Sequence, residues 1–149
     1  MSVLPPGTIL QLMFLRERLA ELPPGHFIEV GPGQGEITAS LLDAGWTGTV
    51  CDLDDKTACF LKKRFAKERN NGRLEVISKN YFDLSGVEDS DLIVSCMVME
   101  HLNSEQERQF MDVSSRLLRK DGRLICLVPA SPAHWGIEDE IAGHFRRYT

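Results

Sequence analysis

The spacing of apolar residues alternates along the chain between a helical period and short continuous runs, and this alternation predicts the secondary structure. Helical spacing bounded by proline, glycine or a capping residue predicts helices over residues 8–22, 36–44, 54–70 and 103–121. Short apolar or β-branched runs predict strands over residues 26–31, 48–53, 73–78, 91–96 and 123–128. Strands and helices therefore follow one another along most of the chain.

Several of the predicted strands are apolar almost throughout, which is typical of a parallel sheet covered by helices on both faces. We therefore predict an α/β fold in a single domain over residues 1–149. Its parts are an N-terminal helical segment (1–25), a core (26–130) and a tail (131–149). Ligands of such sheets bind outside the carboxyl ends of the strands, so the loops after the strands are the place to look for a site.

Length and composition narrow the class of protein. The chain has 149 residues, 42% of them hydrophobic, which suffices for one domain, and no apolar run approaches the ~18 residues of a membrane span. The N-terminus lacks the pattern of a signal peptide, so we expect a cytoplasmic protein. A net charge of −5 lacks the basic footprint of a nucleic-acid-binding protein. The four cysteines form no C-x-x-C pair, and we expect free thiols and no metal site.

The strongest motif is a glycine-rich turn between the first predicted strand and the helix that follows it. Its sequence is Gly31-Pro32-Gly33-Gln34-Gly35. Glycines permit a tight turn and let a ligand approach the backbone where the helix N-terminus presents free N–H groups. An ordinary glycine-rich turn is one alternative. A dinucleotide site is another, but its G-x-G-x-x-G pattern needs a third glycine where Glu36 stands.

A second motif ends the next predicted strand, where Asp52 follows Gly31 by 21 residues. A carboxylate at this place can accept hydrogen bonds from both hydroxyl groups of a ribose. Asp54 or Asp55 can instead cap the helix that follows and interact favourably with its dipole. We expect Asp52 to bind a ligand and Asp54 to cap the helix.

The motifs and their order along residues 26–130 resemble those of the class I S-adenosylmethionine-dependent methyltransferases. The glycine-rich turn is similar to motif I of that family, with Glu29 as the acidic residue that is usual two positions before the first glycine. The resemblance implies a Rossmann-like, doubly wound parallel sheet of strand order 3-2-1-4-5. It also implies S-adenosylmethionine as the cofactor and Asp52 as the ribose ligand, with Asp54 as second choice.

Later motifs extend the resemblance. Asn80 stands where many family members have an acid that accepts from the adenine amino group, and Tyr81 or Phe82 is expected beside the adenine ring. Met97 and Val98 are implied to line the pocket toward the methyl group. The full set of cofactor-binding residues that the resemblance implies is Glu29, Gly31, Gly33, Gln34, Gly35, Asp52, Leu53, Asn80, Tyr81 and Met97.

Histidines supply the candidates for catalysis. His101, in a Glu-His pair that is common at this place in relatives, and His144 in the tail are the candidate catalytic residues. His134 is a further candidate base or substrate contact. The tail residues that can contact an anionic acceptor are Arg146, Arg147 and Tyr148. For the tail residues, the alternative is a surface ion pair near Glu138, Asp139 and Glu140, and for His101 it is a structural role.

The resemblance implies transfer of a methyl group to a small-molecule metabolite or cell-envelope precursor, because the tail is similar to that of bacterial methyltransferases of this kind. A donor-binding module without turnover and, less favoured, a nicotinamide-dependent oxidoreductase are the alternatives. The family usually continues with an antiparallel pair of strands that this sequence lacks, which leaves the fifth strand as an open sheet edge. We expect a truncated chain, which puts catalytic activity in question, or a homodimer in which a second chain covers that edge.

Overall fold

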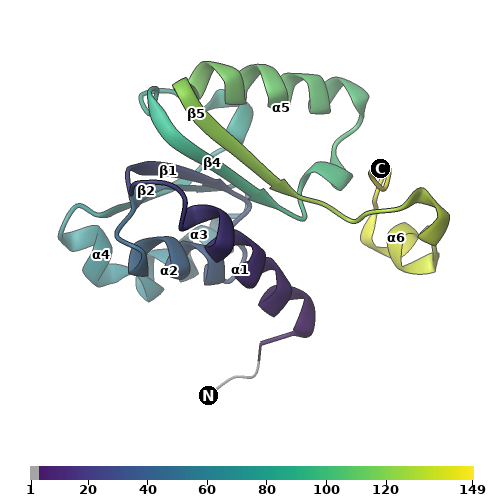
Figure 1. Cartoon of the computed structure of the whole chain (residues 1–149), viewed down its shortest axis with the longest axis horizontal. Helices are drawn as coiled ribbons and strands as arrows, with labels where there is room; N and C mark the ends of the chain where they lie inside the picture. The colour runs from purple at the N-terminus through teal and green to yellow at the C-terminus, as the bar shows by residue number, and fades with distance from the viewer. Residues whose placement is uncertain (1–3) are drawn as a thin grey trace.

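Five parallel strands form the centre of the computed structural model, which describes residues 4–149 (Figure 1). The strands are β1 (His26–Val30), β2 (Thr47–Asp52), β3 (Leu74–Ser78), β4 (Ser90–Cys96) and β5 (Leu118–Leu127). Their order in the sheet is β3-β2-β1-β4-β5, which confirms the predicted doubly wound α/β fold. The first three residues of the predicted segment 1–25 lie outside the described residues.

Helices cover both faces of the sheet. Figure 1 shows α5 on one face and α1 to α4 on the other. Their bounds are α1 (Pro6–Leu19), α2 (Glu36–Asp43), α3 (Asp55–Arg64), α4 (Ala66–Asn70) and α5 (Ser104–Leu117). From β1 the sheet is built outward in both directions, through β2 to β3 on one side and through β4 to β5 on the other. The point where the strand order switches therefore lies beside the carboxyl end of β1.

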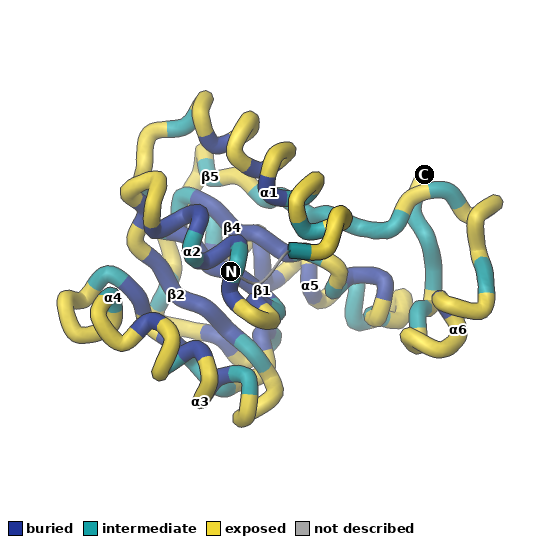
Figure 2. Tube along the Cα trace, turned by 90° about the horizontal axis from the view of Figure 1, so that it is seen from below, coloured by how far each residue is buried: buried dark blue, intermediate teal, exposed yellow. Residues whose placement is uncertain are grey.

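The side chains of each strand alternate between two apolar clusters, one on each face of the sheet. Phe27 packs with Leu41 of α2 and Leu61 of α3 on one face. The next residue, Ile28, packs with Phe110 of α5 on the other face. Burial on both faces explains why the inner strands β1, β2 and β4 are largely apolar runs, and Figure 2 shows these three strands as the buried centre of the molecule, whereas β5 is intermediate or exposed.

Three of the predicted boundaries were wrong. The opening helix ends at Leu19 instead of residue 22, and it buries only one narrow face, with Leu10 and Met13 exposed. The predicted helix 54–70 is interrupted at Phe65, whose backbone leaves the helical region with φ −106° and ψ 32°. The buried ring of Phe65 packs beside Gly35, which holds the break in place.

The third error concerns the end of α5 and the start of β5. Asn103 caps α5, and a capping box with Gln106 is formed as predicted. The helix ends at Leu117, however, and the Asp121-Gly122 pair predicted as a turn lies inside β5. The pairing of β4 with β5 shifts register at this place. A Cβ on Gly122 would lie 2.9 Å from the carbonyl oxygen of Ser90, so glycine lets the irregular strand approach its neighbour.

The tail folds back toward the end of β4 after leaving β5. It contains a short 3-10 helix, η3 (Pro132–His134), and the helix α6 (Ile137–Ala142), which projects from the body of the molecule in Figures 1 and 2. A bridge between Ala130 and Tyr148 closes the tail on itself. β5 forms the outer edge of the described sheet, and a homodimer at this edge stays a prediction.

Within residues 4–149, no helix has the length and apolar character that crossing a membrane requires.

Candidate functional site

The glycine-rich turn after β1 uses its three glycines in two different ways. All three have positive φ, 66° at Gly31, 53° at Gly33 and 81° at Gly35. A Cβ on Gly31 would lie 2.6 Å from Val98, and one on Gly35 would lie 2.7 Å from Phe65. No described atom lies within 4 Å of the corresponding position at Gly33. Gly31 and Gly35 are therefore required for packing, whereas Gly33 leaves open space above the turn.

Two cavities meet at Gly31, beside the switch point of the sheet. The first, of about 260 Å³, lies over the ends of β2 and β3. The second, of about 410 Å³, lies over the glycine-rich turn and is lined by Gln34. Both have Gly31 in their lining and lie along the carboxyl ends of the strands, where ligands of such sheets bind, and we call this pair of cavities the crevice.

Asp52 lies at the wall of the first cavity, and its role as a ribose ligand stays a prediction. One of its carboxylate oxygens accepts the backbone N–H of Asp54 at 2.8 Å, which orients the carboxylate. The exposed side chain of Leu53 lines the same cavity. Asp54 caps α3 by accepting from the backbone N–H of Thr57 at 2.8 Å, so the predicted helix cap is confirmed.

Asn80, Tyr81 and Phe82, which were predicted to lie beside the adenine, all line the first cavity, and their contact with a ligand stays a prediction. The Asn80 side-chain oxygen accepts the backbone N–H of Phe82 at 3.1 Å, capping the 3-10 helix η1 (Tyr81–Asp83). Tyr81 is buried against Phe110, and its hydroxyl pairs with Ser114 at 2.8 Å. Burial raises the pKa of Tyr81 to about 12. Tyr81 therefore belongs largely to the core, although both it and Phe82 line the cavity.

Glu29 brings a buried carboxyl group to the second cavity. It is 2% exposed, and the Thr38 hydroxyl of α2 donates to its Oε2 at 2.5 Å. Burial raises the pKa of Glu29 to about 7, against the lowering effect of this hydrogen bond. Near neutral pH the free protein thus holds a carboxyl group that a cationic ligand can ionise.

This raised pKa predicts a pH-dependent cost of Glu29 to stability. The pKa of Glu29 rises from 4.5 to about 7 on folding. The favourable contribution of this carboxyl group to the free energy of unfolding is therefore complete below pH 4.5 and is lost as pH rises through 7. Glu29→Gln keeps an acceptor for Thr38 and removes the charge. We expect this variant to be more stable than the parent at pH 8, by up to about 3 kcal/mol, and to lose most of that advantage at pH 4.5.

Urea unfolding at both pH values measures the difference. Glu21→Gln, at an exposed position of the same residue type, is the control and should show little difference at either pH. A gain for Glu29→Gln that did not grow with pH would contradict the assignment.

The loop after β4 joins the two cavities. Met97 lines the second cavity, and Val98 and Leu102 line the first. Met97 has a positive φ of 56°, an uncommon conformation for this residue type, and its N–H donates to the Leu127 carbonyl at 2.8 Å. Met97 thus lines a cavity beside the glycine-rich turn, and its predicted place near the methyl group stays a prediction.

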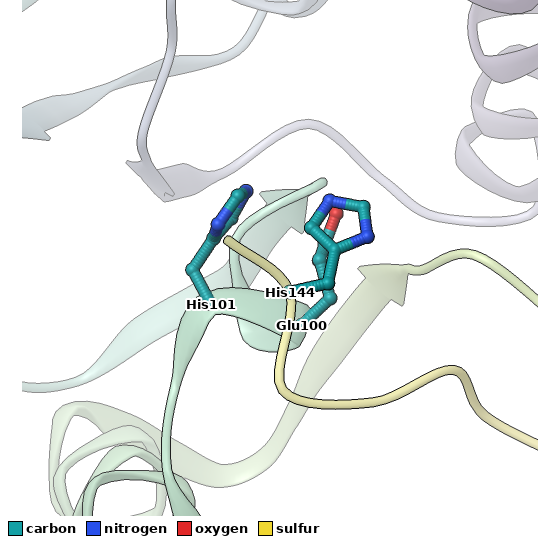
Figure 3. Close-up of side chains that lie close together, drawn as sticks. All are labelled: Glu100, His101 and His144. Atoms are coloured by element: carbon teal, nitrogen blue, oxygen red, sulfur yellow. The ribbon is translucent and has the colours of Figure 1, made fainter. Parts of the chain in front are cut away.

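Glu100, His101 and His144 come together beside this loop (Figure 3). One potential ligand atom of each lies within 4.8 Å of the others. Glu100 is fully buried on the 3-10 helix η2 (Met99–His101), and neither carboxylate oxygen has a hydrogen-bond partner in the part of the chain described. Burial raises the pKa of Glu100, whereas its own backbone N–H and, to a smaller extent, the nearby His101 and His144 lower it. The sequence predicted the two histidines as candidates but did not predict that they would meet.

The tail is fixed to the body of the protein by its own polar residues. Phe145 donates its N–H to the Glu100 carbonyl at 2.7 Å, and Tyr148 donates its hydroxyl to the Met99 carbonyl at 3.2 Å. Arg146 forms an ion pair with Glu107 of α5. These contacts position the tail and place His144 beside η2.

Asp139 of α6 organises the polar centre of the tail. It is 1% exposed and accepts from Arg147 at 2.9 Å and from the Gly136 N–H at 2.9 Å, and its Oδ1 lies 2.8 Å from His144 Nδ1. Burial alone would raise the pKa of Asp139, but these hydrogen bonds lower it to about 2. For Arg147, the alternative of an ion pair is confirmed, whereas His134 lies exposed on η3.

Several residues that line the crevice were not predicted from the sequence. Thr8 and Gln11 of α1 line the second cavity, and Gln106 and Phe110 of α5 line the first. Both pairs lie on helices whose apolar spacing predicts only a side that faces the core. Only the packing of those helices shows that one edge of each faces the crevice.

Residues 28–126 match a protein family described as a methyltransferase domain. An uncharacterized methyltransferase, YrrT, from Bacillus subtilis is 29% identical over 101 residues, which are 67% of this chain and 45% of that protein. A probable ribosomal RNA small subunit methyltransferase A from Haloquadratum walsbyi is 37% identical over 60 residues, which are 40% of this chain and 20% of that protein. The chain thus spans less than half of the length of these relatives.

The same fold occurs in the N-methyltransferase NodS from Bradyrhizobium japonicum, solved in complex with S-adenosylhomocysteine. The two structures superpose with a TM-score of 0.73 at 24% identity, over 92% of this chain and 65% of that one.

Proposed function

This chain belongs to the methyltransferase domain family, and from that membership we propose that it binds S-adenosylmethionine in the crevice beside Gly31 and transfers its methyl group to a small-molecule acceptor. One observation carries the proposal. Two cavities share the glycine turn at Gly31, and each is lined by an acidic residue, Asp52 in the first and Glu29 in the second. An adenosyl amino acid has a ribose diol next to its adenine and an ammonium group at its amino-acid end, so each acidic residue has a matching group on the ligand.

The first cavity receives the adenosine half. Asp52 has one carboxylate oxygen held by a backbone N–H, and its remaining acceptor capacity is proposed to take the ribose hydroxyls. Leu53 and Phe82 are proposed to enclose the adenine, together with the part of Tyr81 that lines the cavity. Asn80 has used its oxygen once as a helix cap, and its amide N–H groups are proposed to face an adenine ring nitrogen.

The second cavity receives the amino-acid half. Glu29 is proposed to bind the ammonium group, which would ionise a carboxyl that is partly protonated at pH 7. Gly33 leaves the space for the ligand to lie on the backbone, and Gln34 lines the wall beside it. Met97 is proposed to contact the ligand near its reacting end, because it projects into this cavity from the loop that joins the two.

Bound S-adenosylmethionine supplies an electrophilic methyl group on a sulfonium sulfur. The residues of the chain supply alignment, with the acceptor atom held in line at ~3–3.5 Å from the carbon under attack. His101 and His144 are proposed to act on the acceptor, since they lie together beside the loop that carries Met97. The net charge of −5, without an overall basic footprint, supports a small molecule over a nucleic acid as the proposed acceptor. A cytoplasmic location stays a prediction.

Isothermal titration calorimetry tests the proposal. We expect S-adenosylhomocysteine to bind with one site per chain and NAD to give no signal. The ligand complexed in the NodS structure supports this choice. Binding of NAD alone, or of neither ligand, would overturn the proposal. Binding without transfer of labelled methyl to any metabolite of a panel would instead favour a donor-binding module.

A further inference from the structure

The Glu100–His101–His144 cluster has a feature that neither packing nor the cofactor crevice explains. Glu100 is 0% exposed, and both of its carboxylate oxygens lack a hydrogen-bond partner within residues 4–149. A buried carboxylate without a partner costs several kcal/mol and is normally paired or bound to a metal. The two imidazoles lie within reach, yet the carboxylate makes no hydrogen bond to either.

His144 is held in an orientation that suits metal binding. Its Nδ1 lies 2.8 Å from Asp139 Oδ1, and Asp139 also accepts from Arg147 and from the Gly136 N–H. A carboxylate held by a guanidinium can only accept, so His144 must donate from Nδ1, which leaves the lone pair on Nε2 free. Metal-binding histidines almost always donate their other ring N–H to a carboxylate in this way.

We propose that Glu100, His101 and His144 bind a first-row divalent transition metal ion, with Zn²⁺ as the tightest of those readily available. Two imidazoles and one carboxylate are a common three-residue set for Zn²⁺, Mn²⁺ or Fe²⁺, and they leave positions open for other ligands. The absence of a thiolate and the presence of two imidazoles disfavour Cu⁺, Mg²⁺ and Ca²⁺.

The geometry needs only side-chain movement to reach a bound state. Ligand atoms around tetrahedral zinc lie roughly 3.3 Å apart, because each bond is ~2.0–2.1 Å. The present atoms lie within 4.8 Å of one another. His101 is exposed, and its ring lies edge-on to that of His144 with 4.8 Å between the ring centroids. His144 and Glu100 are already linked through the Phe145–Glu100 backbone hydrogen bond of 2.7 Å.

Such a site would define the class of acceptor, a step that rests on the proposed function. A metal with open positions would bind an oxygen or nitrogen atom of the acceptor and lower its pKa, so that its proton is lost to solvent water. The deprotonated atom would then attack the methyl carbon as the carbon–sulfur bond of the donor breaks, which releases S-adenosylhomocysteine. The histidines then act on the acceptor through the metal and do not take its proton themselves. The acceptor class is accordingly a chelating small molecule, such as one with adjacent hydroxyl or carboxylate oxygens.

Metal binding is measured on the chelator-treated chain by titration with Co²⁺, followed by visible absorption, and with Zn²⁺ by competition. We expect one Co²⁺ per chain with nitrogen and oxygen ligands and no thiolate charge-transfer band. Glu100→Gln, His101→Ala and His144→Ala should each weaken binding by at least tenfold. His134→Ala, which removes an exposed tail histidine outside the cluster, is the control and should bind as the parent does.

Each outcome decides for or against the site. Lack of binding by the parent, a thiolate band, or parent-like binding by all three cluster variants would overturn it. Because Glu100→Gln changes a buried group, His101→Ala at an exposed position keeps the test valid if the first variant fails to fold. Calorimetry with S-adenosylhomocysteine on the same proteins separates the two proposals. If the parent binds S-adenosylhomocysteine but no metal ion, only the metal site is overturned. If it binds the metal ion but not S-adenosylhomocysteine, only the proposed function is overturned.

Discussion

Asp52→Asn is expected to weaken S-adenosylhomocysteine binding by more than tenfold, which corresponds to at least about 1.4 kcal/mol. Hydrogen bonds from ribose hydroxyls to a charged carboxylate contribute more than those to a neutral amide. Asparagine at this position keeps an oxygen for the Asp54 N–H, so the local backbone is preserved. The loss therefore reports the missing charge and acceptor. Calorimetry of the purified variant measures it.

Asp54→Asn provides the matched control. It removes the same charge two residues away, on a side chain that caps α3 through Thr57 and does not line the first cavity. Asparagine caps helices about as well as aspartate, so stability should change little. We expect the affinity of Asp54→Asn to stay within twofold of the parent. If Asp52→Asn and Asp54→Asn lost the same affinity for S-adenosylhomocysteine, Asp52 would act only through long-range electrostatics and not through direct hydrogen bonds to the ribose.

Asp52 and Asp54 show why much of the site was predictable. Sequence patterns identify the strand end, and in a parallel sheet every strand end lies at the same edge, so the loops after β1, β2, β3 and β4 must meet. The distinction between the two acids also follows from local rules, since a helix cap is a property of the residues next to it. The order of the strands required the family resemblance as well.

Other features depend on contacts that no local pattern contains. The cluster at Glu100 and His144 joins residues 44 positions apart, and it exists because Phe145 and Tyr148 bind the backbone of η2. The hydrogen bond between the Tyr81 hydroxyl and Ser114 of α5 also joins residues far apart in the sequence, so the burial of Tyr81 could not be predicted from the sequence around it. The start of β5 was misplaced because its glycine serves a close approach between strands, which looks the same in sequence as a turn.

Gly33→Ala is the second variant with a large expected effect. It tests whether a ligand needs the open space above the glycine turn, apart from the effect of the substitution on the backbone of the turn. The alanine Cβ would enter the second cavity, where no described atom lies within 4 Å of its position. The positive φ of 53° makes alanine unfavourable by about 1–2 kcal/mol in stability. We expect the folded variant to bind S-adenosylhomocysteine at least tenfold more weakly, because the methyl group occupies space that the ligand needs.

Gly72→Ala is the control that isolates this steric effect. Gly72 also has a positive φ, 75°, and open space at its Cβ position, but it lies in the turn between α4 and β3 and lines neither cavity. Both variants should therefore lose similar stability in urea unfolding, while only Gly33→Ala loses affinity. If the two variants bound the ligand equally well, the amino-acid half could not lie against the glycine turn, since a ligand in contact with that backbone must meet the added methyl group.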